Sequence, residues 1–369
     1  MGRSKILALF LIVLLLISGC TDLRSSKGEE ASTEGKKNLI QEEEKKENLE
    51  EEIEIDYKKI KPNELGDILV VMYHGLVKND PPSIWQRTIE GFKKDLEYMY
   101  ENDYRPITMK DYIENNIDIE AGYTPIVITF DDSLSSSYSM QEVDGELIPT
   151  KDTAVDIMNK FAQENPDFGK AAIFFMNANP FMRDSLTDIK GQGDLKERLE
   201  YLLDQGYELG NHTFTHPKLN QLKETEVQKE IGEINNMVKE VLPEATLDYF
   251  SYPFGLRPDD KSNKLIISGQ YDGVTYNHSA AVREAPRSPY FVPPVHKDFD
   301  IYNISRTVGT EGNDMDLWWY FKDYEKNPDR RYISDGNPDR ISIPKELEDQ
   351  LDKKKIEKDK EVYLYDLTE

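Results

Sequence analysis

Two adjacent carboxylates at the end of an apolar segment constrain this chain more than any other feature. Residues 126–133 read IVITFDDS, so that Asp131 and Asp132 follow a short apolar run directly. Such a run is typical of a buried strand, and burying charge costs several kcal/mol unless a metal or a cation offsets it. The chain must therefore supply a positive partner for these acids.

Two histidines offer the missing ligands. His212 and His216 lie four residues apart in GNHTFTHPKL (residues 210–219), after another short apolar run. One Asp and two His give the mixed oxygen and nitrogen ligation that suits Zn²⁺ or a related divalent ion, with positions left open for water. The second Asp is then free to act as a base.

These two segments together resemble a known family. TFDD (residues 129–132) is similar to the first motif, and HTFTHP (residues 212–217) to the second, of the polysaccharide deacetylases, which are carbohydrate esterases that carry the NodB-homology domain. Order and spacing agree, and a predicted strand precedes each motif. The resemblance implies metal-dependent hydrolysis of an acetyl group.

The resemblance also implies a role for each residue. A metal held by Asp132, His212 and His216 would polarise the acetamide carbonyl and lower the pKa of its bound water. Zinc is the first expectation, with Co²⁺, Ni²⁺ and Mn²⁺ as alternatives. Asp131 would accept the proton of the attacking water. A backbone N–H near Tyr252 would hold the oxyanion together with the metal.

The general acid is less clear from the sequence. The family often takes it from a Leu-x-His motif near the end of the domain, which this chain lacks, whereas Met72-Tyr73-His74 resembles the branch that deacetylates poly-N-acetylglucosamine, in which this motif is permuted to the N-terminus. We therefore expect His74 to be the acid, with His296 as the fallback. We expect His278 to be structural or exposed. A His74 that only hydrogen-bonds at the end of a strand is the competing interpretation.

One position departs from the family pattern. The third motif usually opens with an Arg that orients the catalytic Asp, whereas here the segment SYPFG opens with Ser251. The poly-N-acetylglucosamine branch tolerates this loss, but the group that tunes Asp131 is left open. Arg306 could replace the missing cation, although an Arg on a surface strand is the interpretation that the sequence favours.

The fold class follows from the order of the predicted elements. Strands alternate with helices through some 230 residues, which favours parallel βαβ units in a barrel or an open doubly wound sheet. The resemblance decides for a distorted (β/α) barrel of the NodB-homology type. In barrels, active residues collect at the carboxyl ends of the strands, where both motifs lie. The polar stretch 134–150 is expected to be an irregular loop, either a lid or an idle insertion.

The two ends of the chain differ from the middle. Residues 1–20 combine Arg3 and Lys5 with a short apolar run and end at Cys20, the only cysteine, which resembles a bacterial lipobox. An uncleaved anchor or an ordinary signal is the alternative. We expect residues 21–61 to be a charged flexible tether, 62–325 the deacetylase domain, and 326–369 a charged tail. The protein would then be extracytoplasmic, anchored to the membrane by lipid.

The charge excludes one class of partner. The formal net charge of −25 argues against nucleic-acid binding, since phosphate contacts need clustered Lys and Arg. We therefore expect a deacetylase of an N-acetylglucosamine-containing polymer, with exopolysaccharide ahead of peptidoglycan. The alternatives are a degenerate glycan-binding lipoprotein, a metal-dependent amidohydrolase of a small substrate and a structural lipoprotein.

Overall fold

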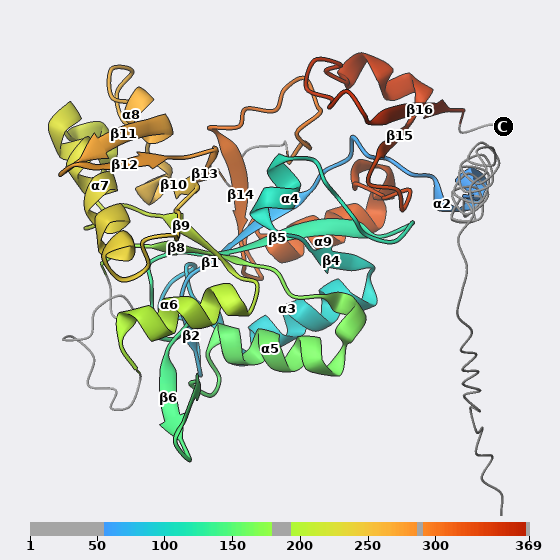
Figure 1. Ribbon diagram of the computed structural model, residues 1–369. Helices are drawn as coiled ribbons and strands as arrows, with labels where there is room; N and C mark the ends of the chain where they lie inside the picture. The colour runs from blue at the N-terminus through green and yellow to red at the C-terminus, as the bar shows by residue number, and fades with distance from the viewer. Residues whose placement is uncertain (1–54, 179–192, 286–290, 367–369) are drawn as a thin grey trace, which may run out of the picture. The chain divides into compact units, whose positions relative to one another are not determined.

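Parallel strands close into a barrel around a common interior (Figure 1). The computed structural model describes residues 55–178, 193–285 and 291–366. The ring runs in the order β1 (Leu69–Tyr73), β14 (Ile304–Val308), β13 (Ala280–Glu284), β10 (Tyr249–Ser251), β9 (Glu208–Asn211), β8 (Ile173–Met176) and β5 (Thr124–Phe130). It closes because β1 also pairs with β5, and β4 (Tyr104–Pro106) extends the sheet beside the first half of β5. The predicted distorted (β/α) barrel is confirmed.

Helices cover the outside of the barrel in the alternation that the sequence predicted. They are α3 (Ile89–Glu101), α4 (Met109–Ile113), α5 (Ala154–Glu164), α6 (Leu195–Asp204), α7 (Glu224–Val241), α8 (Lys264–Ile267) and α9 (Leu317–Lys326), while α2 (Tyr57–Ile60) instead packs its Tyr57 ring against Tyr363 and Tyr365. Thr88, Thr108 and Thr153 each begin a helix by accepting a backbone N–H of its first turn, which satisfies a donor that the helix itself leaves unpaired.

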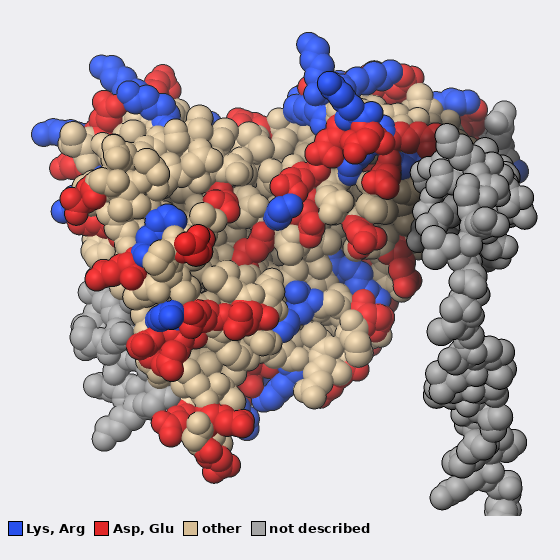
Figure 2. All heavy atoms as spheres, viewed as in Figure 1, with Lys and Arg blue, Asp and Glu red and all other residues tan. Residues whose placement is uncertain are grey.

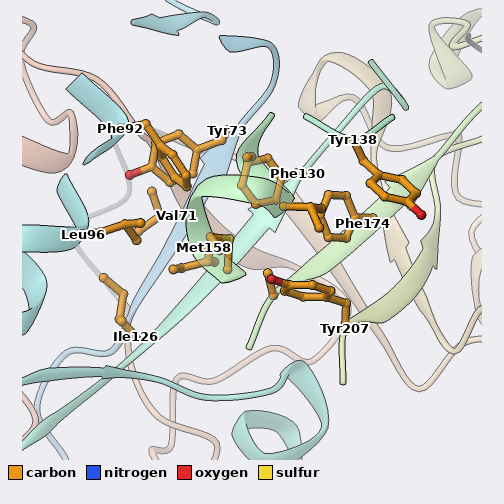
Figure 3. Close-up of a cluster of buried hydrophobic side chains, with 14 of the residues drawn as sticks. Val71, Tyr73, Phe92, Leu96, Ile126, Phe130, Tyr138, Met158, Phe174 and Tyr207 are labelled. Carbon is orange, nitrogen blue, oxygen red and sulfur yellow. The ribbon is translucent and has the colours of Figure 1, made fainter. Parts of the chain in front are cut away.

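Alternate residues of the strands face two different cores. Val71, Tyr73 and Phe130 point outward into a cluster shared with helices α3, α5 and α6, while Val70 and Val127 point into the barrel. Figure 3 shows the aromatic part of the outer cluster, in which the Phe130 ring stacks against Phe174 with centroids 5.0 Å apart. Because side chains alternate along a strand, Asp131, which follows the outward-facing Phe130 directly, is directed to the interior side.

The stretch 134–150 is more regular than predicted. It contains the antiparallel hairpin of β6 (Met140–Val143) and β7 (Glu146–Pro149), which projects away from the barrel in Figure 1. Asp144 and Gly145 both have positive φ at its turn. Asp-Gly is a strong signal for a two-residue hairpin turn, and the expectation of an irregular loop overlooked it.

A hairpin outside the ring precedes one of the barrel strands. It consists of β11 (Ser268–Tyr271) and β12 (Val274–Asn277), which pair antiparallel. The barrel strand is β13, which begins with the buried Ala280 and pairs with β10 and β14. The small residues Ala280 and Ala281 gave a weak hydrophobic signal, although their position in the barrel keeps them fully buried.

The C-terminal segment that we expected to be a charged tail is folded as far as residue 366. β15 (Arg340–Pro344) and β16 (Glu361–Tyr365) pair in parallel. Ile341 and Ile343 are buried in a cluster with Leu65 and Val295, so these strands pack against the segment that leads into β1. The described residues from 55 to 366 therefore form one compact unit without a boundary near residue 326.

The N-terminal expectations lie outside the described residues. The predicted signal peptide, its Cys20 and most of the tether fall within residues 1–54. Among the helices that the structure describes, none has both the length and the apolar character to cross a bilayer. Figure 2 shows acidic and basic side chains interspersed over the face in view.

Candidate active site

The adjacent side chains of Asp131 and Asp132 point into different surroundings where β5 ends. Asp132 and Ser133 have φ of 75° and 49°, which are left-handed values that non-glycine residues seldom adopt. The bend leaves Asp131 buried, with a side chain 2% exposed, and Asp132 partly open at 24%. The strained turn thus places two adjacent acids in different environments, as functional sites often do.

Arg306 is the cation that balances the buried acid. Its Nη1 donates to Asp131 Oδ1 at 2.8 Å, and its Nη2 donates to Asp131 Oδ2 at 2.6 Å. The side chain of Arg306 is buried, so the interpretation as an Arg on a surface strand was wrong. Two parallel bonds of this kind fix the carboxylate plane.

Ser251 completes this arrangement at the position where the family pattern has Arg. Its hydroxyl lies 3.1 Å from Asp131 Oδ2 and 2.8 Å from Arg306 Nη2, so it accepts from Arg306 and donates to the carboxylate. Arg306 reaches the site from β14, one strand beyond β13 in the ring. The cation that is missing from the third motif is therefore supplied by a different strand.

These contacts keep Asp131 ionised. Burial by itself would raise the pKa of Asp131, but the charge of Arg306, then that of His212, and the hydrogen bonds from Arg306 hold it well below its usual value. An ionised carboxylate accepts hydrogen bonds and protons and donates neither. The environment therefore suits Asp131 to the role of a base.

Asp132, His212 and His216 come together as predicted. One ligand atom from each residue can be chosen so that all three lie within 4.8 Å of one another. The Nε2 atoms of the two histidines lie 3.5 Å and 3.6 Å from Asp132 Oδ1. His216 has a φ of 57°, a further left-handed residue at the site.

The donor set fits a divalent ion. His212 Nδ1 lies 2.8 Å from the carbonyl oxygen of Ser251, which fixes that nitrogen as the donor and leaves Nε2 as the lone-pair ligand. That Nε2 is buried without a hydrogen-bond partner among the described residues. A buried ring nitrogen aimed at a carboxylate and a second imidazole is the arrangement that a metal ligand requires.

Asn177 is a site residue that the sequence reasoning missed. It follows β8, and its Nδ2 donates to Asp132 Oδ1 at 2.9 Å, while its backbone N–H donates to Ser133 Oγ. It orients the carboxylate of the ligand from the neighbouring strand. The signal was available, because a polar residue directly after a predicted barrel strand belongs at the edge where the motifs lie.

His74 lies beside the three candidate metal ligands. Its Nε2 is 3.9 Å from Asp132 Oδ2, and its Nδ1 is buried without a partner among the described residues. Burial lowers the pKa of His74, although Asp131 and Asp132 act in the opposite direction. A ring of Trp85 lies 5.8 Å from its own, centroid to centroid.

The other two histidines lie in different surroundings. The fallback acid His296 contacts Gln350 through Nε2 and accepts the backbone N–H of Asp298 through Nδ1, in the region packed against β15. His278 is buried between the rings of Phe250 and Tyr276. Neither is brought to Asp131 by a described contact, so His278 is structural and the fallback is not supported.

Tyr252 does not offer the oxyanion donor that we expected. Its backbone N–H donates to the carbonyl oxygen of Val282 at 3.0 Å, and its hydroxyl donates to that of Tyr302. Both donors are therefore used within the fold. Two residues later, Phe254 has a φ of 57°, is 51% exposed and packs its ring 4.5 Å from that of His216. The strained residue that borders the site is Phe254.

Comparisons with known proteins agree with this geometry. Residues 119–269 match the family model described as polysaccharide deacetylase. A chitooligosaccharide deacetylase of Sinorhizobium fredii is 31% identical over 67 residues, which are 18% of this chain and 31% of that protein. YxkH of Bacillus subtilis, a protein named after the same family, is 22% identical over 226 residues, 61% of this chain and 70% of that one.

A solved structure is similar as well. The Streptococcus pyogenes deacetylase PplD, in complex with acetate, aligns with a TM-score of 0.47 at 16% identity, over 66% of this chain and 92% of that chain. The match to the rhizobial enzyme spans less than a third of that protein's length. The matched segment of the family model contains Asp131, Asp132, His212 and His216. Residues 119–269, which carry the site, are therefore similar to the polysaccharide deacetylase family.

Proposed function

We propose that this protein is a metal-dependent N-deacetylase of a polysaccharide that contains N-acetylglucosamine. The observation that carries the proposal is a buried, ionised Asp131 clamped by Arg306 directly beside the three ligands Asp132, His212 and His216. A site that only bound sugar would gain nothing from a buried charged cluster whose desolvation costs several kcal/mol.

Asp131 acts as the base in this proposal. Its carboxylate is held rigidly beside the ligands, with Oδ2 3.6 Å from His212 Nε2, and Oδ1 keeps a lone-pair position that no described hydrogen bond uses. A bound divalent ion supplies Lewis-acid activation of water and of the acetyl carbonyl. Arg306 holds the carboxylate in place and keeps it ionised until it takes the proton.

His74 acts as the acid. It faces Asp132 from the β1 side of the site, whereas His212 and His216 approach from β9. An amine leaves as a neutral group only if it receives a proton, and imidazole supplies protons near neutral pH. In this proposal the leaving nitrogen lies between His74 and the ligands.

The remaining parts of the proposal concern the oxyanion and the cell envelope. Around β10 the described hydrogen bonds use the N–H groups of Tyr252, Gly255 and Leu256. We therefore assign the oxyanion contact to the N–H of Phe254. We also propose that Cys20 carries a lipid that anchors the protein outside the cytoplasmic membrane, on the strength of its lipobox-like context.

The test measures acetate release and metal content together, with the purified full-length chain on poly-N-acetylglucosamine, peptidoglycan and O-acetylated xylan. We expect release from an N-acetylated polymer that stops with a chelator and returns with added Zn²⁺. Asp131→Asn should lower the rate by about 10²- to 10⁴-fold with its metal retained, whereas His212→Ala should lose both metal and activity.

His296→Ala is the matched control for His74→Ala. We expect the rate to fall by about 10²-fold or more in the His74 variant and to stay near wild type in the control. The reverse result would move the acid to His296. Bound metal with no acetate from any glycan would favour an amidohydrolase of a small substrate or a binding protein, and the absence of bound metal would overturn the proposed site.

A further inference from the structure

A cavity lies next to the catalytic site, on the side of His74. It has a volume of about 220 Å³, below the roughly 300–1,000 Å³ of pockets for drug-sized ligands, so it can hold about one sugar unit. Its lining residues are Ile84, Glu284, Val308, Thr310, Asn313, Asp314, Met315 and Asp316. They come from the ends of β13 and β14, from the loop before α9 and from the segment before α3.

Strand register ties this cavity to the catalytic residues. Glu284 pairs with Arg306 across β13 and β14, and Val308 pairs with Met72, two residues before His74. Ile84 precedes Trp85, whose ring lies beside that of His74. A sugar unit in the cavity would therefore be a neighbour of the unit whose acetyl group is removed.

Three carboxylates line the cavity, and they differ in whether a hydrogen bond already uses them. Asp316 is already used, since its carboxylate accepts the backbone N–H groups of Asn313 and Trp319 at the start of α9. Glu284 is partly buried and Asp314 is exposed, and neither has a hydrogen bond or an ion pair with another described residue. No Lys, Arg or His of the described residues lines the cavity.

The nearest cation is already engaged. Arg306 lies beside Glu284 in register, but both of its Nη atoms donate to Asp131. Burial raises the pKa of the partly buried Glu284 and the charges of Arg306 and Arg283 lower it, but no cation of the described residues forms an ion pair with its carboxylate. Ile84, Val308 and Met315 add an apolar wall, while Thr310 and Asn313 offer hydroxyl and amide groups, so the cavity can contact both the face and the edges of a pyranose ring.

We propose that this cavity binds a protonated amino sugar, a glucosamine unit next to the N-acetylglucosamine unit whose acetyl group is removed. The proposal rests on the proposed function. A glucosamine ammonium supplies an ion-pair partner for Glu284 and Asp314, which form no ion pair with the described residues, whereas an acetamide at the same position is neutral. The enzyme therefore prefers polymer that is already partly deacetylated, and it extends blocks of free amine.

The test compares two tetramers of N-acetylglucosamine that differ in one unit, which is glucosamine in the second. With the metal-loaded full-length protein, kcat/KM for acetate release should be about five- to tenfold higher for the tetramer that contains glucosamine. The preference should shrink as salt is raised from about 20 mM to about 500 mM, because screening weakens a partly exposed ion pair.

Glu284→Gln should bring the ratio of the two kcat/KM values close to one. Glu244→Gln is the matched control, because Glu244 is exposed in the loop that leads into the opposite end of β10, and it should keep the wild-type ratio. Asp314→Asn provides a second variant and should lower the ratio about two- to threefold.

Equal rates on the two tetramers for the wild-type protein would overturn the subsite, as would a preference that survives both Glu284→Gln and Asp314→Asn. Failure of the proposed function looks different, because the wild-type protein would then release no acetate from the fully acetylated tetramer either.

Discussion

Among the described residues, two buried Asp carboxylates each accept two hydrogen bonds from one Arg, and the two pairs have different roles. At the active site, Arg306 donates two hydrogen bonds to Asp131. Beneath the barrel, Arg87 donates two to Asp95 of α3, at 2.7 Å and 3.0 Å. Both carboxylates are at least 98% buried. Pairing and burial alone therefore do not identify a catalytic acid.

The difference lies in how many donors surround each carboxylate. Asp95 also accepts from the indole N–H of Trp318 and from the hydroxyl of Tyr73, so it has four donors. Asp131 has three among the described residues, two from Arg306 and one from Ser251. A carboxylate offers about four lone-pair positions. Asp95 is saturated, whereas Asp131 keeps one position for a proton.

The first prediction breaks the saturated pair. Asp95→Asn should lower the free energy of unfolding by about 3–5 kcal/mol, because it leaves Arg87 buried without its counter-charge. The rate of acetate release per folded molecule should stay near wild type. Urea denaturation measures the first quantity and activity normalised to folded protein the second. A large loss of rate in a fully folded variant would show that the two pairs are coupled.

The second prediction breaks the pair of Arg306 and Asp131 at the active site. Arg306→Lys should lower kcat by about tenfold to a hundredfold, because an ammonium group cannot reproduce the two parallel bonds that orient Asp131. Metal content should stay unchanged. Arg87→Lys is the matched control, and it should reduce stability without this loss of kcat. Equal rates for the two variants would contradict the role that we assign to Arg306.

The third prediction sharpens the comparison with a buried carboxylate that lacks an Arg of its own. Glu64 accepts the backbone N–H groups of Asp335 and Ser342. Burial, and then repulsion from Asp335, raises the pKa of Glu64 to about 8 from an ordinary value of 4.5. Its charged form is thus disfavoured where that of Asp131 is favoured.

The sign of the pH effect follows from that shift. Between about pH 4.5 and pH 8 the unfolded chain loses a proton that the folded chain retains, so stability declines as the pH rises, by up to about 1.4 kcal/mol per pH unit. Unfolding by urea at pH 5 to 8 measures this slope. Glu64→Gln should flatten it and Glu244→Gln should not. A slope that is the same in both variants would mean that Glu64 does not titrate in this range.

Local patterns in the sequence were sufficient for much of the site. Asp131, Asp132, His212 and His216 each follow a short apolar run, and residues that follow parallel strands meet at one edge of a barrel. Their convergence therefore depends only on where the strands end. The same reasoning would have reached Asn177, which also follows a strand.

The sequence determined the barrel strands that carry the two motifs and the residues at their ends, because hydrophobic periodicity acts within a few residues, whereas it missed β13, β15 and β16. Only the tertiary structure decided that Arg306 is buried against Asp131, since that contact joins residues 175 positions apart. The same holds for Tyr252, whose N–H is used by Val282 of the adjoining strand. Long-range pairing across the closed barrel decides which polar groups are free, and no local pattern contains that information.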